Sequence, residues 1–250
     1  MRAAMPPDTI PPAARLHRGA FWRIAWTVVT ILAVEFMVCT LAVLPVAFAW
    51  RHLIRLTGRS LVARLIAFSA AAVPSYTLFA LALMLLTAVA TRLLGWRTPP
   101  DAEMRIADAD WPVLRWARSM VALHIVRVFA GPLFRGSPIW TAYLRLSGAR
   151  LGRRVYINTL SVSDYNLLEF GDDVVIGADV HLSGHTVERG LVRTAPVRLA
   201  RNVTIGLGSV IDIGVEAGAG CQVGALSLVP KFSRLESGAT YVGVPVERLD

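Results

Sequence analysis

Two long apolar runs dominate the first hundred positions of the chain. The first extends from Ile24 to Trp50 with Glu35 as its one charged residue, and the second extends from Leu65 to Thr91 without a charge. Each exceeds the ~20 residues that cross a bilayer as a helix, whereas the apolar core of a signal peptide has only ~7 to 15 residues. The pattern predicts a transmembrane α-helical hairpin over residues 21–94, after an N-terminal tail at residues 1–20.

Arginines flank both runs and predict the orientation of the hairpin. Two spans place both ends of the hairpin on one side of the membrane, where six arginines outweigh the three of the connection, so the positive-inside rule favours cytoplasmic termini. We therefore expect a bacterial inner membrane protein whose C-terminal domain is cytoplasmic. Glu35 should face a partner helix or a polar cavity, because a carboxyl group in lipid is costly. The arginines are Arg15, Arg18 and Arg23, then Arg51, Arg55 and Arg59, then Arg92, Arg97 and Arg105.

Residues 95–147 have a different pattern, which predicts a linker and an interfacial helical segment. The Pro pair and alternating acids of RTPPDAEMRIADAD indicate the linker. Residues 111–134 are apolar but contain Arg115, Arg118, His124 and Arg127. We expect a surface helix at the membrane interface here, with Trp111 and Trp116 at headgroup depth.

From Leu151 onward apolar residues recur with a period of six. Ten hexads begin with a mostly aliphatic residue, and the fifth place of each is small or β-branched. A period of six is not helical, and a short strand and a turn per hexad explain it better. The fifth places, expected to point inward, are Val155, Ser161, Val174, Val180, Thr186, Val203, Ser209, Val215, Cys221 and Ser227. Residues 148–250 are predicted to form a parallel β-helix.

Composition and charge agree with a membrane protein. The 250 residues are 55% hydrophobic with mean hydropathy +0.54, and the net charge is +9. The arginines flank apolar runs and form no stripe with interleaved aromatics, which favours anionic lipid headgroups over nucleic acid as the partner. A disulfide between Cys39 and Cys221 is implausible, because one lies in an apolar run and the other at a core position of the repeat.

The hexads resemble those of the left-handed β-helix, or hexapeptide-repeat, acyltransferases. RLSGARLGRRVYINT, SVSDYNLLEFGD, GHTVE and LSLVPKF…YVGVP also resemble the membrane-associated C-terminal region of nonribosomal peptide synthetases of the ε-poly-lysine synthetase type. The chain departs from these synthetases in having one helix pair and one module without adenylation or carrier domains. The resemblance implies a homotrimer that transfers an acyl or aminoacyl group from a thioester, of coenzyme A or of a phosphopantetheinyl carrier protein, to a hydroxyl or amine. The alternative is a non-catalytic module that assembles peptide synthetase components at the membrane.

The repeat breaks after LSGHTV, and VERGLVRTAP is predicted to be a loop extruded from the β-helix. In the resembled acyltransferases a histidine beside such a loop is the general base, which makes His185 the candidate. Glu188 could orient the imidazole, and Asp164 is the second candidate carboxylate. The competing interpretation is that His185 is a polar corner residue and Glu188 a solvated charge.

The same region contains the candidate residues for a metal site and for a donor site. His181 and His185 are the two histidines of the repeat, and a zinc site would need a third ligand at a recognisable spacing, so no metal is expected. The resemblance implies a thioester groove near the C-terminal coils, although small residues also occur there for core packing. The donor-site candidates are Gly206, Gly208, Ser209, Ala225, Ser227 and Lys231.

Overall fold

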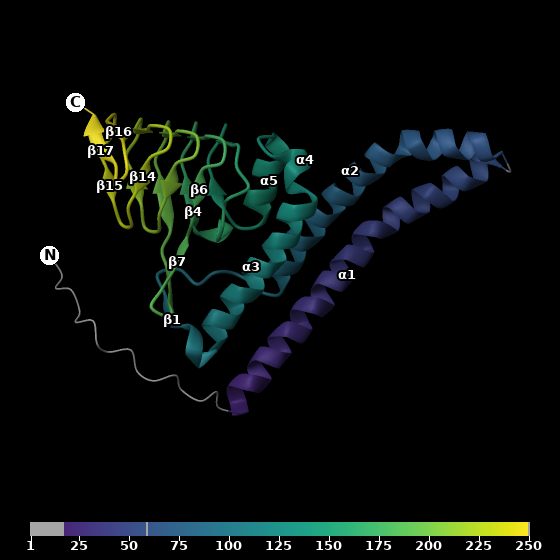
Figure 1. Cartoon of the computed structure of the whole chain (residues 1–250), viewed down its shortest axis with the longest axis horizontal. Coiled ribbons are helices and arrows are strands. Elements are labelled where there is room, and N and C mark those ends of the chain that lie inside the picture. Colours follow the sequence, from purple (N-terminus) through teal and green to yellow (C-terminus); the bar gives the residue numbers. More distant parts are fainter. Residues whose placement is uncertain (1–17, 59, 250) are drawn as a thin grey trace.

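Two long antiparallel helices form the N-terminal part of the molecule. The computed structural model describes residues 18–58 and 60–249, so Arg15 and Arg59 lie outside the described residues. Helix α1 spans Arg18–Thr57 and α2 spans Leu61–Leu93, where Ser60 caps α2 by accepting a hydrogen bond from the Ala63 N–H. Both helices are long and apolar enough to cross a membrane, judged by length and composition. The predicted helical hairpin is therefore present, and Figure 1 shows its tip projecting beyond the rest of the chain.

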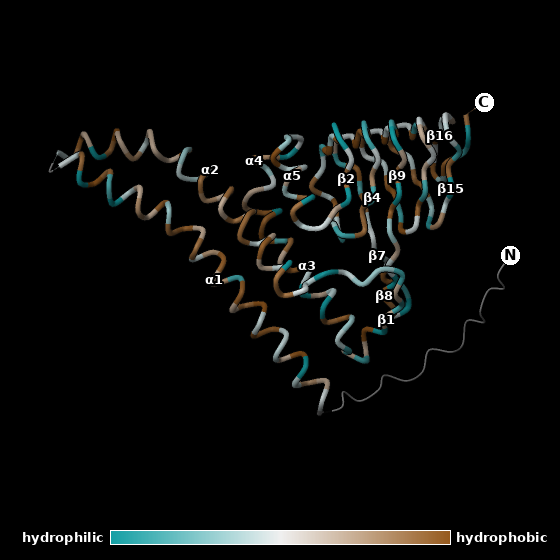
Figure 2. Tube along the Cα trace, turned by 180° about the vertical axis from the view of Figure 1, so that it is seen from behind, coloured by the Kyte–Doolittle hydropathy of each residue, from teal (hydrophilic) through white to brown (hydrophobic). Residues whose placement is uncertain are grey.

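Glu35 faces other helices, as predicted. It lines a small cavity between α1, α2 and the helix that follows, together with Thr87 and Thr91. The Thr91 hydroxyl donates to the Thr87 carbonyl oxygen at 2.8 Å, which satisfies a polar group inside an apolar helix. Figure 2 shows hydrophobic colouring along most of both helices.

The segment after the hairpin packs against it. It contains β1 (Glu103–Arg105), η1 (Ile106–Asp108), α3 (Trp111–Phe129), α4 (Gly131–Phe134) and α5 (Pro138–Leu146). Helix α3 buries Val113, Ala122 and Val126 and contacts both α1 and α2. The predicted helix is therefore present, but one of its faces packs on the hairpin, which the prediction of a surface helix did not include. Trp111 is still 46% exposed, but Trp116 packs against the β-helix domain and is not at a lipid-facing position.

The remaining chain forms the predicted parallel β-helix, in which three short sheets run along the stack (Figure 1). Thr204 pairs with Gln222 and Gln222 pairs with Thr240, so a full coil takes 18 residues. One sheet contains β2 (Arg150–Leu151), β4 (Leu168–Phe170), β9 (Val197–Leu199), β12 (Glu216–Ala217) and β15 (Arg234–Leu235). The second contains β3 (Tyr156–Ile157), β5 (Val175–Ile176), β10 (Thr204–Ile205), β13 (Gln222–Val223), β16 (Thr240–Val242) and the antiparallel β17 (Glu247–Leu249). The third contains β6 (His181–Leu182), β11 (Val210–Ile211) and β14 (Leu228–Val229).

The predicted inward positions are buried with two exceptions. Ser161 is exposed because the first coil turns one residue early: Thr159 takes the inner corner position, and Val162 bridges to Leu182. Thr186 is wrong for a different reason, since it lies outside the coil altogether. The repeat also continues beyond the ten hexads, with Leu235 and Ala239 buried in the last coil.

The predicted loop after His185 is an ordered β-hairpin. Strands β7 (His185–Glu188) and β8 (Leu191–Thr194) pair in antiparallel fashion, and β1 adds a third strand beside β8. Gly190 has φ +74°, which a tight turn between the two strands requires. The hairpin therefore ties the β-helix to the segment that precedes α3.

Candidate active site

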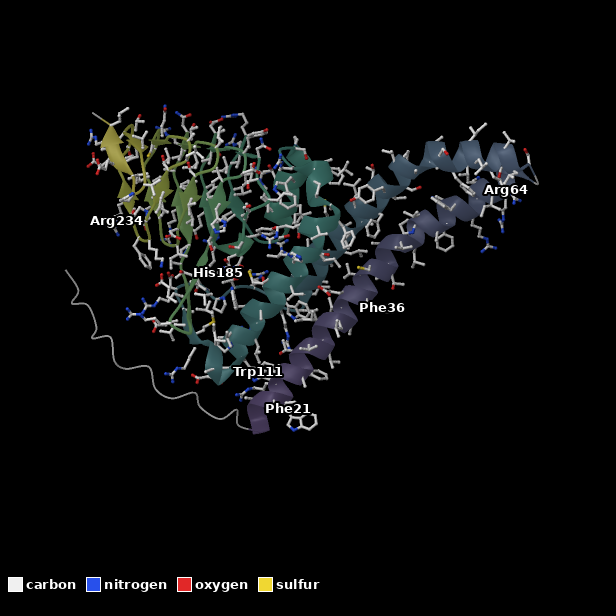
Figure 3. The ribbon with its side chains drawn as sticks, viewed as in Figure 1. Phe21, Phe36, Arg64, Trp111, His185 and Arg234 are labelled. Atoms are coloured by element: carbon white, nitrogen blue, oxygen red, sulfur yellow. The ribbon has the colours of Figure 1, made fainter. Side chains whose placement is uncertain are left out.

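His185 and Asp164 meet at one corner of neighbouring coils. Asp164 is fully buried and has a left-handed backbone conformation with φ +51°. A Cβ atom at Gly184 would lie 2.8 Å from the Asp164 Cβ, so a residue without a side chain is required beside the carboxylate. Figure 3 shows His185 between the β-helix and α3.

A chain of hydrogen bonds fixes the imidazole. His185 Nδ1 lies 2.6 Å from Asp164 Oδ2, and the Thr98 hydroxyl donates to Asp164 Oδ1 at 2.6 Å. Asn166 holds Thr98 in turn, because its amide donates to the Thr98 carbonyl oxygen and accepts from the Thr98 N–H. A carboxylate that accepts the Nδ1 proton leaves Nε2 as the nitrogen that can take a proton from a substrate. The pair has the chemistry of an oriented general base.

Helix α3 covers the imidazole from the other side. The Trp116 indole meets the His185 ring edge to face, with ring centroids 5.1 Å apart. The His185 side chain keeps 22% of its surface exposed. The candidate site therefore lies between the β-helix corner and a helix of the same chain, and Trp116 and Thr98 belong to it although the sequence pattern did not identify them.

Glu188 does not orient His185, contrary to the sequence-based suggestion. It lies on the exposed end of β7 and forms an ion pair with Lys231. The hydrogen bond from Lys231 holds the pKa of the Glu188 carboxyl below its usual value. Both residues are therefore used to tie the β-hairpin to a later coil, and Asp164 takes the orienting position.

Three of the six predicted donor-site residues, Gly206, Ser209 and Ser227, are packing residues in this structure. Ser209 and Ser227 are buried, and the Ser209 hydroxyl donates to the Gly224 carbonyl oxygen, so these side chains cannot line an external groove. A Cβ atom at Gly206 would lie 2.4 Å from the Ala225 N. The close stacking of the two coils therefore requires a glycine at this position. Gly208 has φ +65° at a corner, and Ala225 is exposed.

Two other candidates can be placed. His181 is an outward-facing residue of β6, as expected, and the part of the chain that the structure describes holds no group of three His, Cys, Asp or Glu residues suited to a metal. Burial raises the pKa of the Cys221 thiol to about 11, so this cysteine is a protonated core residue at neutral pH.

A β-helix built from hexads, with an oriented histidine at a corner, fits the class of hexapeptide-repeat acyltransferases. Comparisons with known proteins support this class, although no family model matches the chain. The chain is 34% identical over 116 residues to galactoside O-acetyltransferase of Escherichia coli, covering 43% of this chain and 55% of that protein. It is 23% identical over 157 residues to delta-poly-L-ornithine synthetase of Acinetobacter baumannii, covering 61% of this chain and 11% of that protein.

Among solved structures, the chain is similar to galactoside acetyltransferase in complex with coenzyme A. The identity is 27%, the TM-score is 0.36, and the match covers 42% of this chain and 55% of that chain. The two curated relatives, an O-acetyltransferase and a poly-ornithine synthetase, support the resemblance to hexapeptide-repeat acyltransferases and to synthetases of the poly-lysine type. The chain spans about half the length of one of these relatives and about a tenth of the other.

Proposed function

We propose that this protein is a membrane-anchored acyltransferase with His185 as its general base. The single observation that carries the proposal is the contact of 2.6 Å between His185 Nδ1 and the buried Asp164 carboxylate. The relative named as an O-acetyltransferase favours acyl-coenzyme A as the donor and a hydroxyl group as the acceptor. An amine acceptor and a carrier-protein thioester are the variants that the synthetase relative suggests.

The reaction follows from the oriented imidazole. His185 Nε2 takes the proton from the acceptor O–H or N–H while that oxygen or nitrogen forms a bond to the thioester carbonyl carbon. The C–S bond then breaks, and the proton on the imidazole passes to the departing thiolate. Asp164 stabilises the imidazolium formed in between, since its carboxylate is already desolvated and hydrogen bonded.

The test compares two histidines of the same coil. The full chain is purified in detergent and incubated with acetyl-coenzyme A and a panel of galactosides and amino acids, and thiol release is followed. We expect His185→Ala to lower the rate roughly 10² to 10⁴-fold, the usual contribution of a positioned base. His181→Ala is the matched control, because His181 is outward-facing on β6, and it should keep the wild-type rate. Equal rates in His185→Ala and wild type would refute the role of the base.

A non-catalytic module of a peptide synthetase is the second candidate. The match to the poly-ornithine synthetase favours this candidate, because the matched segment of 157 residues is longer than the β-helix domain. This candidate predicts no thiol release with acetyl-coenzyme A or with an acyl carrier protein, and co-purification of a carrier domain that survives His185→Ala. Transfer from the carrier protein alone would instead identify a peptide-forming enzyme.

Membrane attachment rests on α1 and α2. Both helices are long and apolar enough to cross a membrane, and large apolar side chains such as Phe48 are exposed along α1. Figure 3 shows Phe36 on the same helix. We propose the bacterial inner membrane with the β-helix on the cytoplasmic side, where coenzyme A and carrier domains are found.

A further inference from the structure

Arg118 on α3 is held in an unusual environment for a positive charge. Its guanidinium lies over the faces of Trp96 and Trp111, with distances of 5.8 and 5.6 Å to the ring centroids. Its Nη2 donates to the Thr27 hydroxyl at 3.1 Å, while its Nε is buried with no hydrogen-bond partner in the part of the chain described. The aromatic contacts fix the position of the group but supply no counter-charge.

A second cation lies beside it. Arg115 is exposed one helical turn earlier on α3, and neither arginine forms an ion pair with any carboxylate of residues 18–58 and 60–249. The nearest acid along the chain, Asp110, already pairs with Arg23. Burial and the proximity of Arg115 lower the pKa of the Arg118 guanidinium, which is the direction expected for a cation without an anion nearby.

Both chain segments that hold Arg118 also contact the catalytic pair. Trp116 precedes Arg118 by two residues and packs on His185, and Trp96 precedes Thr98 by two residues, where Thr98 bonds to Asp164. Side chains two positions apart on a helix leave it in different directions, so Arg118 is linked to the pair only through these shared segments. An anion bound by Arg118 would lie beside α1, where the Arg118 Nη2 meets the Thr27 hydroxyl.

The surroundings suit a lipid headgroup. Trp22 and Trp26 are 71% and 60% exposed on α1, next to Thr27, and Trp111 is 46% exposed. Exposed tryptophans beside arginines are typical of the interfacial level of a membrane, where lipid phosphates lie. Figure 3 shows Phe21 and Trp111 at the same end of the molecule.

We propose that Arg115 and Arg118 form a phosphate-binding site that holds the phosphate of a membrane lipid beside the helical hairpin. The guanidinium fork matches phosphate oxygens, and the lipid supplies the missing negative charge. This site does not depend on the proposed acyltransferase function. The phosphates of coenzyme A have the same chemistry, so the experiment must separate the two sources.

Binding is measured by calorimetry on the full chain in detergent. The probes are dihexanoyl phosphatidic acid, dihexanoylglycerol as the same lipid without phosphate, and coenzyme A. Wild-type protein should bind the phosphatidic acid, and Arg118→Gln should weaken this binding about 10-fold or more, since a charge-assisted contact is lost. Binding of dihexanoylglycerol and of coenzyme A should not change, and Arg201→Gln, an exposed arginine of the β-helix, is the matched control.

Four outcomes are decisive. Arg115→Gln is at an exposed position and should fold, so a loss of phosphatidic acid binding of several-fold in this variant supports the site even if Arg118→Gln fails to fold. Weakened coenzyme A binding with unchanged phosphatidic acid binding would overturn the lipid assignment in favour of the donor. Unchanged binding of both probes in Arg115→Gln and in folded Arg118→Gln would refute the phosphate site. A wild-type protein that binds phosphatidic acid through Arg118 but transfers no acyl group would refute only the proposed function.

Discussion

Asp164 is the residue on which the proposed chemistry depends. Its carboxylate is fully buried and accepts from Thr98 and His185 at the same time. Asp164→Asn keeps the shape but removes the negative charge that stabilises the imidazolium. We expect kcat to fall roughly 10²-fold or more with little change in the KM for acyl-coenzyme A. A variant with wild-type kcat would show that the carboxylate has no part in the reaction.

Thr98 provides a finer test of the same pair, because its hydroxyl donates a hydrogen bond to the Asp164 carboxylate. Thr98→Val removes one hydrogen bond to a buried charge and should lower kcat about 10-fold. Thr98→Ser retains the hydroxyl and should stay close to wild type. The comparison uses acyl-transfer rates and melting temperatures together, and equal rates in both variants would assign Thr98 a packing role alone.

The sequence identified part of this site. His185 was found because the hexad pattern stops beside it, and Asp164 was named as a second carboxylate. Glu188 was preferred as the orienting group because it is close in sequence, but the β-hairpin turns it toward Lys231. Thr98 could not be found, since 66 residues separate it from Asp164 and no local pattern indicates such a contact.

The β-helix coil is the element whose register the sequence specifies most closely. Val203 is fully buried and the following residue, Thr204, points outward from β10. Val203→Asp would bury an unpaired charge, at a cost of about 3 kcal/mol or more, and should unfold the domain or lower its melting temperature strongly. Thr204→Asp is the matched control and should melt near the wild-type temperature. Circular dichroism of the full chain in detergent distinguishes the two, and equal melting curves would mean that the register is wrong.

The errors of the pattern occur where coils depart from six residues per side. Ser161 is predicted to point inward because the pattern assumes six residues on a side of the coil that has only five. Thr186 is predicted to point inward because the hydrophobic pattern continues into the β-hairpin, which has already left the coil. The surroundings of α3 were missed for another reason: an apolar face predicts burial, but it does not say whether lipid or protein covers it.

The helical hairpin makes a separate prediction about topology. A reporter active only after export, fused at the C-terminus, should stay inactive, whereas the same reporter inserted at Gly58 in the connection should be active, because two spans place the connection on the opposite side. An active C-terminal fusion would show that the C-terminus is exported and would contradict the predicted orientation. Inactivity at both positions would mean that α1 and α2 lie on the membrane without crossing it.

The β-helix presents two contrasting surfaces, a charged sheet and an apolar corner. One sheet carries an alternating ladder in which every neighbouring pair is an ion pair, so its charges are satisfied within the chain. The ladder residues are Arg150, Glu169, Arg198, Glu216 and Arg234. The corner between the other two sheets instead exposes Leu207 and Leu226 on successive coils, at 56% and 69%. Contact between copies at this apolar corner would remove both leucine side chains from water.

We therefore expect a homotrimer formed through the apolar corner. Leu226→Asp places a charge there and should convert the trimer to monomers, while Glu216→Gln on the ladder face should leave the trimer intact. Mass photometry of the full chain in detergent measures both. A trimer that persists in Leu226→Asp would exclude this corner as the interface.

The activity of the monomeric variant then tests where the acceptor and donor bind. Trp116 and Thr98 of the same chain already complete the surroundings of His185, so the base should remain oriented in a monomer. We propose, however, that the thioester groove of the trimer lies between neighbouring β-helices. We expect Leu226→Asp to raise the KM for acyl-coenzyme A at least about 10-fold, because one wall of the groove is lost, while the acceptor's KM changes little. A monomer with the wild-type KM for both substrates would mean that one chain holds the complete site.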